Sequence, residues 1–320
     1  MYYSIRHLTR FKYDSPVQES IMEVRKQPRS EGLQLCLSFD LTVSPKARVL
    51  QYRDYLGNTI HHFNVPGKHT QLQVLAEARV ETGAAPMLPP RLGYDAWGEL
   101  DHIVHNGDYS EFLMPSDFAK PTPWLNELAE ELNVVRRDDP LTVLAEVNSG
   151  IFSAFDYVPK STKVDSPIDD ALKARKGVCQ DFTHIMTSLV RQYLRVPCRY
   201  VSGYLYHGRF DHDRSADGAT HAWVEALLPG LGWIGLDPTN NLLAGERHIR
   251  TAIGRDYNDV PPTHGVFKGN ARSELSVSVH VTPTDTPLPL DVEMLSPMAF
   301  IVPPEEEEAQ LAQQQQQQQQ

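Results

Sequence analysis

Two kinds of hydrophobic spacing divide the chain. From residue 1 to about residue 118, apolar and polar residues alternate in short segments that are separated by Gly, Pro, Asn and Asp. Such alternation is typical of β-strands joined by turns. From residue 119 to 283, apolar residues first recur every three or four positions and then alternate. The pattern predicts an α+β protein: an N-terminal β-sandwich domain (1–118), then a domain (119–283) of helices packed on an antiparallel sheet.

Strand-like alternation occurs in five segments of the first domain, which are residues 2–13, 35–43, 47–52, 59–65 and 72–82. Turn signals, among them Asp14-Ser15-Pro16 and Pro66-Gly67, predict where these strands end. Residues 84–90, rich in Pro and Ala, predict an irregular crossing segment. A last alternating segment, residues 274–282, either completes the sheet of the second domain or returns to the first domain.

Cap residues and prolines predict where the helices of the second domain begin. Thr122-Pro123 and Asp139-Pro140 each combine an N-cap residue with a first-turn proline, and Ser166-Pro167 opens a short third helix. The first of these helices is expected to bury the stripe Trp124, Leu125, Leu128 and Leu132. A fourth helix is predicted beyond Gly177 by helical spacing of apolar residues, and strands are predicted at 198–206, 220–228 and 232–236.

The first turn of the fourth predicted helix contains a candidate catalytic residue. Gly177 interrupts regular structure just before this helix, so Cys179 falls in its first turn, where unpaired N–H groups and the helix dipole stabilise a thiolate. A nucleophilic cysteine needs a base, and the base needs an orienting group. His221 and Asp237 lie on two predicted strands joined by the Pro229-Gly230 turn, which can place them side by side. Cys179, His221 and Asp237 are therefore a candidate triad.

Four motifs around these residues resemble the bacterial transglutaminase-like family. They are Gly-Val-Cys-Gln-Asp-Phe (177–182), Tyr-Val-Ser-Gly-Tyr (200–204), His-Ala-Trp-Val-Glu (221–225) and Gly-Trp-Ile-Gly-Leu-Asp-Pro-Thr-Asn (232–240). The motifs agree in order and spacing, and the resemblance extends from the first residues to about Pro283. It implies a papain-like core that is preceded by a β-sandwich without catalytic residues. It also implies catalytic roles for Cys179, His221 and Asp237.

Further residues are candidates for the substrate or oxyanion site. The backbone N–H of Cys179 is expected to stabilise an oxyanion, because amides at a helix start point toward an attacked carbonyl oxygen. The resemblance implies that Tyr157 borders this site, and Gln180 is the polar neighbour of the cysteine. Glu225 shares one strand face with His221, and it either lines the site or pairs with an arginine.

Together, the resemblance and the candidate triad indicate cysteine-dependent acyl transfer on a peptide or protein amide through a thioester. Water as the acceptor would make the protein a peptidase or amidase, whereas an amine would make it a transglutaminase. The same triad serves both reactions. Hydrolysis is favoured, since bacterial proteins that resemble this chain are more often hydrolytic. The alternative from another class is a non-catalytic binding module, and the intact triad argues against it.

Neither a metal ion nor another cofactor is expected. His61 and His62 are neighbours in a strand and point to opposite faces. Structural-zinc spacing is absent from the possible set Cys179, His184, Cys198 and His221. The polar loop 207–218 contains Asp-x-Asp but lacks the glutamate that closes a calcium loop. This loop is instead expected to border the cleft and to govern substrate choice.

The composition narrows the partners and the compartment. The net charge is −11 and no Lys- or Arg-rich run occurs, so binding to nucleic acid or to an anionic membrane is not expected. The sequence contains neither a signal-peptide core nor an apolar stretch that could span a bilayer. Three cysteines give no disulfide framework, which predicts a reducing cytoplasm, with Cys36 and Cys198 in core packing. The Pro-, Glu- and Gln-rich residues 284–320 are predicted to be disordered.

Overall fold

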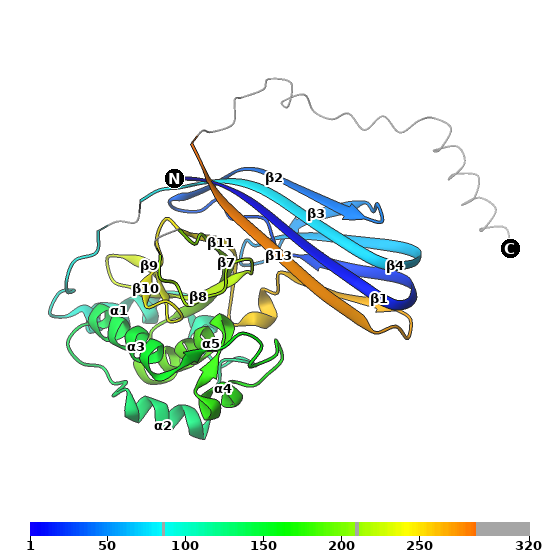
Figure 1. The fold of residues 1–320 in the computed structure, drawn as a ribbon. Coiled ribbons are helices and arrows are strands. Elements are labelled where there is room, and N and C mark those ends of the chain that lie inside the picture. Colours follow the sequence, from blue (N-terminus) through cyan, green and yellow to red (C-terminus); the bar gives the residue numbers. More distant parts are fainter. Residues whose placement is uncertain (85–86, 209–210, 286–320) are drawn as a thin grey trace, which may run out of the picture. The chain divides into compact units, whose positions relative to one another are not determined.

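A curled antiparallel sheet and a second, helix-covered antiparallel sheet make up the fold (Figure 1). The structure is a computed structural model and describes residues 1–84, 87–208 and 211–285. Strands come first and the helices and second sheet follow, which confirms the predicted α+β class. The predicted disordered tail falls, from residue 286 onward, outside the described residues. No helix among the described residues is long and apolar enough to cross a membrane.

The first sheet contains six strands. They are β1 (Tyr2–Val24), β2 (Gln34–Ser44), β3 (Val49–Arg53), β4 (Thr59–Thr82), β12 (Thr263–Lys268) and β13 (Ser273–Thr284). The order β12-β1-β4-β2 runs through the sheet, while β13 pairs with β1 and β3 pairs with β4. Residues 2–13 of β1 pair with residues 273–284, so the last described strand returns to the N-terminal sheet. Of the two predicted alternatives for the last strand, pairing with the sheet of the first domain is therefore the one observed.

Two predicted turns proved to be bends within long strands. β1 continues through Asp14-Ser15-Pro16, and β4 continues through Pro66-Gly67. Register shifts between Lys12 and Glu19 absorb the extra residues, as β-bulges do, and a bulge bends its strand. Residues from both halves of β1 and of β4 consequently share one apolar cluster, which includes Tyr13, Val24, Phe63 and Leu72. A single curled sheet thus encloses the core for which two sheets were expected.

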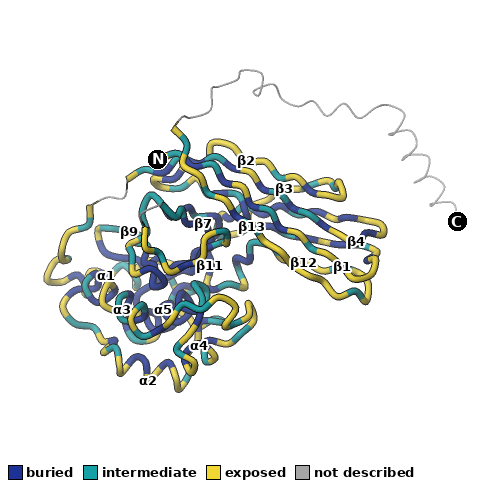
Figure 2. The backbone as a smooth tube through the Cα atoms, in the orientation of Figure 1, coloured by how far each residue is buried: buried dark blue, intermediate teal, exposed yellow. Residues whose placement is uncertain are grey.

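The second sheet has the order β10-β9-β8-β7-β11 and is antiparallel. Its strands are β7 (Cys198–Leu205), β8 (His221–Leu228), β9 (Gly232–Asp237), β10 (Leu242–Leu243) and β11 (His248–Gly254). Strands β7, β8 and β9 confirm the predictions, whereas β10 and β11 were not anticipated. Helix α5 (Cys179–Leu189) packs on β8, and buried stretches run through α5 and β7 (Figure 2).

Helices α1 (Ala96–Asn106), α2 (Pro123–Glu131), α3 (Pro140–Ala154) and α4 (Ile168–Ala174) precede α5. Thr122 and Asp139 cap α2 and α3 as predicted, since their side chains accept hydrogen bonds from the first backbone N–H groups. A π-helical turn, Val190–Leu194, extends α5. Two expectations were wrong. Helix α1 lies in the region expected to be β-rich, and Trp124 is 41% exposed rather than part of the buried stripe of α2.

A buried polar chain links the curled sheet to β7. The side chain of Lys26 is enclosed, and its Nζ donates to Oγ1 of Thr9 at 2.6 Å. Thr9 Oγ1 lies 3.2 Å from Nε2 of His7, and the other ring nitrogen of His7 lies 3.1 Å from the Tyr204 hydroxyl. That hydroxyl donates to the backbone oxygen of Lys26. Burial lowers the pKa of Lys26 to about 7, and burial together with the nearby Lys26 charge lowers the pKa of His7.

The low pKa of Lys26 predicts a pH-dependent stability. Between pH 7 and the unfolded value of 10.5, the unfolded chain binds a proton that the folded chain does not, so stability rises with pH in this window. Lys26→Met should remove this slope and stabilise the protein below pH 7 by a few kcal/mol, on the order of the shift. Denaturant unfolding at pH 6.5 and pH 9 would measure it, with the exposed Lys12→Met as the control. Equal slopes in wild type and Lys26→Met would contradict the assignment.

Candidate active site

The first turn of α5 is capped by the side chain of Asp181, which lies in the same turn. Val178 is the N-cap but makes no side-chain cap; instead, its N–H donates to Oδ2 of Asp181 at 2.8 Å. A Cβ on Gly177 would lie 3.0 Å from Asp181, so glycine permits this close approach. Cys179 is the first residue of the helix and is half-buried. The structure therefore places the thiol where sequence spacing predicted it, at the dipole's positive end.

His221 and Asp237 lie side by side, as the predicted hairpin requires. His221 begins β8 and Asp237 ends β9, and Nε2 of His221 lies 2.8 Å from Oδ2 of Asp237. Both side chains are buried. The other ring nitrogen, Nδ1 of His221, has no oxygen or nitrogen partner within the described part of the chain. It is the nitrogen left for the Cys179 thiol, and the nearby Cys179 sulfur helps to raise the pKa of this imidazole.

Asp237 receives hydrogen bonds on both carboxylate oxygens. Oδ1 accepts from the backbone N–H groups of Thr239 and Asn240 at 2.9 and 3.2 Å. Oδ2 accepts from His221, from Nδ2 of Asn240 at 2.8 Å and from Nε2 of His248 at 3.2 Å. Burial alone would raise the pKa of Asp237, but the two histidines hold it far below the usual value. The carboxylate is therefore ionised although it is completely enclosed.

The two histidines bound to Asp237 differ in charge. Burial lowers the pKa of His221, but the Asp237 charge and hydrogen bond and then the Cys179 sulfur outweigh burial and raise it to about 10. For His248 burial is the strongest influence, and its pKa is lowered. The N–H of Gly245 donates to Nδ1 of His248 at 3.3 Å, so the proton of this neutral ring sits on Nε2 and points to Asp237. His221 is the cationic partner, and His248 is a neutral donor.

The group His221, Asp237 and His248 also has the composition of a metal site, since its ligand atoms lie within 4.8 Å of one another. A metal would need a lone pair on each coordinating nitrogen. Nε2 of His248 instead carries a proton, and Nε2 of His221 lies at hydrogen-bond distance from the same carboxylate oxygen. This donor set fits a hydrogen-bonded network better than a metal centre.

Three tyrosines lie in the neighbourhood of Cys179. Cys179 and Tyr257 pack against the apolar cluster that contains Tyr200. Burial, and then the Cys179 charge, raise the pKa of Tyr157, Tyr200 and Tyr257. Tyr157 lies on β5 (Asp156–Tyr157), which pairs with β6 (Lys176–Gly177) directly before the cysteine. Its hydroxyl oxygen accepts from the N–H of Ala216 at 3.2 Å, which leaves the hydroxyl proton free to donate.

Comparison with known proteins identifies the family. Residues 3–81 match the bacterial transglutaminase-like N-terminal region, and residues 127–238 match the transglutaminase-like superfamily. An uncharacterized protein of Mycobacterium leprae is 32% identical over 278 residues, which are 86% of this chain and 96% of that protein. The chain belongs to the bacterial transglutaminase-like family.

Other similarities agree with this membership. An uncharacterized protein of Mycobacterium tuberculosis is 31% identical over 88% of this chain and 92% of its own length. A crystal structure from Cytophaga hutchinsonii, described as a "putative cysteine protease", has a TM-score of 0.69 at 21% identity and covers 90% of this chain and 92% of its own. At that identity the likeness is one of fold, and it confirms the transglutaminase-like core behind the N-terminal strands.

In this transglutaminase-like protein, the side chains of Gln180 and Glu225 stabilise a loop and the second sheet around the candidate site. Nε2 of Gln180 donates to the backbone oxygen of Val164 at 2.9 Å, so it fastens the loop before α4. Glu225 pairs with Arg199 at 2.7 Å and with Arg250 at 3.2 Å, all three on the second sheet. Of the two interpretations of Glu225, pairing with an arginine is therefore the one observed.

Several residues of the site carried too weak a signal to be predicted. His248 comes from β11, which pairs with the predicted strand β7 but was itself not anticipated. Asn240 follows Asp237 in the Asp-Pro-Thr-Asn motif, and its side chain also binds the N–H groups of Arg214 and Ser215. The fixed spacing from Asp237 could have indicated an Asx-type turn.

Among the described residues, neither the remaining cysteines nor the loop 207–218 forms a second reactive centre. Cys198 is fully buried and burial raises its pKa to about 11, as expected of a core residue. Cys36 was also expected in the core, but it is only half-buried on β2; burial still raises the pKa of its thiol to about 11. Asp211 and Asp213 of the loop 207–218 both bind Arg247, so an arginine neutralises the Asp-x-Asp pair. Residues 209–210 of this loop lie outside the described residues.

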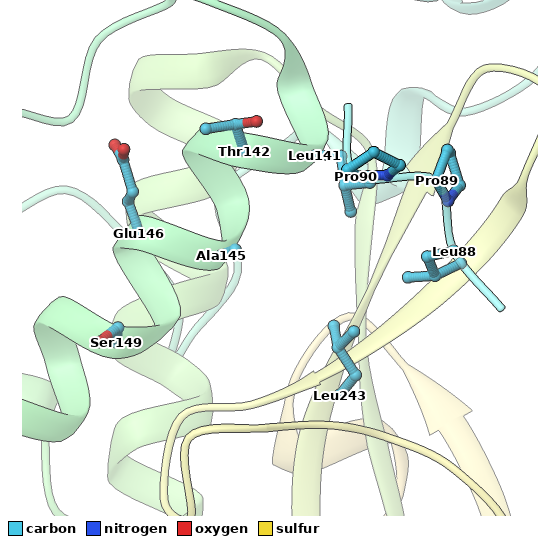
Figure 3. Close-up of a pocket in the computed structure, with 9 residues that line it drawn as sticks. All are labelled: Leu88, Pro89, Pro90, Leu141, Thr142, Ala145, Glu146, Ser149 and Leu243. Atoms are coloured by element: carbon cyan, nitrogen blue, oxygen red, sulfur yellow. The ribbon is translucent and has the colours of Figure 1, made fainter. Parts of the chain in front are cut away.

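Two of the hollows on the described surface bear on the site. One, of about 520 Å³, lies between α3 and residues 88–90, with Leu243 beside them (Figure 3). It shares no lining residue with the cluster around His221. The other, of about 430 Å³, is lined by the curled sheet on one side and by Thr220 and Tyr257 on the other. Since Thr220 precedes His221 and Tyr257 lies near Cys179, this second hollow adjoins the candidate triad.

The pairing of Glu225 predicts a structural phenotype. Glu225→Gln should lower the free energy of unfolding by about 3 kcal/mol, because buried Arg199 loses its buried countercharge and keeps only the partly exposed Glu31 at 3.6 Å. The rate of Cys179 alkylation by iodoacetamide should stay within about twofold of wild type. Glu77→Gln, which removes an exposed pair with Arg6, is the matched control and should change stability little. A large change in alkylation at unchanged stability would instead assign Glu225 to the site.

Proposed function

We propose that this protein is a cysteine-dependent acyl-transfer enzyme acting on peptide or protein amides, with Cys179 as the nucleophile, His221 as the acid and base, and Asp237 as the orienting group. One observation carries the proposal. The His221 ring donates from Nε2 to the buried Asp237 carboxylate, while its other nitrogen remains for the thiol. This is the relation between base, orienting group and nucleophile that a catalytic triad requires.

In the first half of the reaction, the Cys179 thiolate attacks the amide carbonyl carbon. The charge that develops on oxygen is stabilised by the backbone N–H of Cys179 at the start of α5 and by the hydroxyl of Tyr157. The C–N bond then breaks, and His221 gives its Nδ1 proton to the departing amine. A thioester on Cys179 and a neutral His221 remain. Asp237 keeps the Nε2 proton in place, so only Nδ1 changes its protonation state.

In the second half, an acceptor discharges the thioester. Neutral His221 removes a proton from the acceptor, the acceptor attacks the carbonyl carbon, and the C–S bond breaks to restore the thiolate. Water gives hydrolysis, and an amine gives a new amide. We favour hydrolysis, because the structural relative from Cytophaga hutchinsonii is described as a "putative cysteine protease". Protein-glutamine amine transfer is the second candidate, since the family name comes from that reaction and the same residues would perform it.

Removing the nucleophile or the base should abolish or strongly reduce turnover. Cys179→Ala is expected to form no acyl-enzyme. His221→Ala should reduce kcat/KM by about 10²–10⁴. The assay incubates the protein with a glutamine-containing peptide and a labelled amine and follows both by mass spectrometry. Peptide cleavage identifies hydrolysis, whereas amine incorporation identifies transfer. Wild-type-like turnover by Cys179→Ala would sink the proposal.

The raised pKa of His221 sets the alkaline limit of activity. Acylation needs protonated His221, so kcat/KM should fall as the pH rises through about 10 rather than through 6.5. The imidazolium stabilises the folded state below pH 6.5, and this contribution is lost as the pH approaches 10. In Asp237→Asn the charge that raises the pKa is gone, so the alkaline limb should move down by one or more pH units. An unmoved limb would show that Asp237 does not act on His221.

Alkylation of Cys179 by iodoacetamide, measured as a function of pH, tests the non-catalytic alternative. A thiolate paired with an imidazolium reacts with iodoacetamide well below pH 8, whereas an ordinary cysteine reacts only as the pH nears about 8.5. A rate for Cys179 that rises only near pH 8.5 would favour a binding module. Cys36 serves as the internal comparison, because burial raises its pKa to about 11.

A further inference from the structure

The hollow beside the candidate triad has two walls of different origin. The sheet wall consists of residues from β1, β12 and β13, among them Phe11, Val266 and Leu275. The opposite wall comes from the catalytic half and includes Thr220 and Tyr257. β12 and β13 lie after the second sheet in the sequence, so the chain returns to build this wall. We call this hollow the sheet groove.

The sheet groove exposes mainly apolar surface, and His7 and His264 are its only described lining residues that can carry a positive charge. None of its described lining residues is Asp, Glu, Lys or Arg. On the sheet side, Thr9 pairs with Val277 and Phe11 pairs with Leu275 across β1 and β13, so these four side chains share one face. Val266, Leu275 and Val277 are 64%, 57% and 45% exposed. An exposed apolar strip beside a candidate active site is typical of a groove that binds a ligand.

The buried polar cluster around Thr9 on the sheet wall is already satisfied. Thr9 accepts from Lys26 and lies at hydrogen-bond distance from His7, whose other nitrogen contacts Tyr204. Lys26 itself is buried behind Thr9 and is not a lining residue. Apart from the exposed His264 of β12, no side chain of the described wall is therefore available to pair with an ionic group of a ligand. Away from His264, a charged ligand group would lose hydration without gaining a partner.

The sheet groove also lies beside Cys179 and His221, whose atoms would react. Thr220 immediately precedes His221, and the ring of Tyr257 lies near the Cys179 sulfur. Val164 closes the groove on this side, and its backbone oxygen is held by Gln180, the residue after Cys179. A substrate that places its amide at Cys179 thus meets the sheet groove with its neighbouring side chains. The volume of about 430 Å³ suits one or two bulky side chains.

We propose that the sheet groove is the specificity site, and that it selects amide substrates whose side chains beside the reacting bond are bulky and uncharged. This inference rests on the proposed function for the position of the reacting amide. It assigns substrate choice to the curled sheet rather than only to the loop 207–218. Leu275, Val277 and Val266 are the specificity-determining residues, and none of them takes part in the chemistry.

Binding to an inactive variant tests the groove without requiring turnover. The Cys179→Ala protein is titrated with two fluorescein-labelled hexapeptides that differ only at the two central positions, Phe-Leu in one and Glu-Glu in the other. We expect tighter binding of the Phe-Leu peptide. Leu275→Asp and, independently, Val266→Asp in the same background should weaken that binding about tenfold to a hundredfold, as expected for losing one buried apolar side chain.

Leu50→Asp is the matched control, because Leu50 is a 50% exposed leucine on β3 and does not line the groove. It should leave binding unchanged. Thermal melts identify any variant that fails to fold, and all three substituted positions are exposed. Equal binding of the two peptides, or equal effects of Leu275→Asp and Leu50→Asp, would overturn the specificity site. Groove-dependent binding together with an inert wild-type enzyme would contradict the proposed chemistry while leaving the groove intact.

Discussion

The arrangement of the site depends on one buried negative charge. The Asp237 carboxylate is closed off from solvent, and in such surroundings an ion must be compensated by hydrogen bonds and opposite charge. Two backbone N–H groups, one amide and two imidazoles provide that compensation. The charge in turn keeps His221 protonated against the effect of burial. Without it, neither the orientation nor the ionisation of the imidazole would be fixed.

The unequal roles of the two histidines follow from their second hydrogen bonds. His248 accepts from Gly245, so its tautomer is set by the backbone and it can only donate to Asp237. His221 has no such backbone donor at Nδ1 within the described residues, and that nitrogen can therefore exchange a proton with the thiol. One histidine stabilises the carboxylate permanently, and the other couples it to the sulfur. A static donor and a titrating partner can thus share a single acceptor oxygen.

Local chemistry made part of this structure predictable. The caps at Thr122 and Asp139, the first-turn position of Cys179 and the meeting of His221 with Asp237 all follow from neighbours within a few residues or across one short hairpin. The sequence patterns did not predict features that depend on pairing between segments far apart in the chain. Pro16 and Gly67 signal turns, yet two long partners pair past them and convert the turns into bends. His248 reaches Asp237 only because β11 crosses to β7, which no local pattern encodes.

The return of β12 and β13 connects the two halves of the fold physically. β1 pairs with β4 along one edge and with β12 and β13 along the other, so residues from both ends of the described chain form one sheet face. That face supplies one wall of the groove beside the thiol, while the catalytic half supplies the other. Neither half contains a complete groove. Under the proposed function, the curled sheet therefore shapes the reaction without contributing a catalytic residue, because a substrate that reaches Cys179 along this side must also fit against β1 and β13.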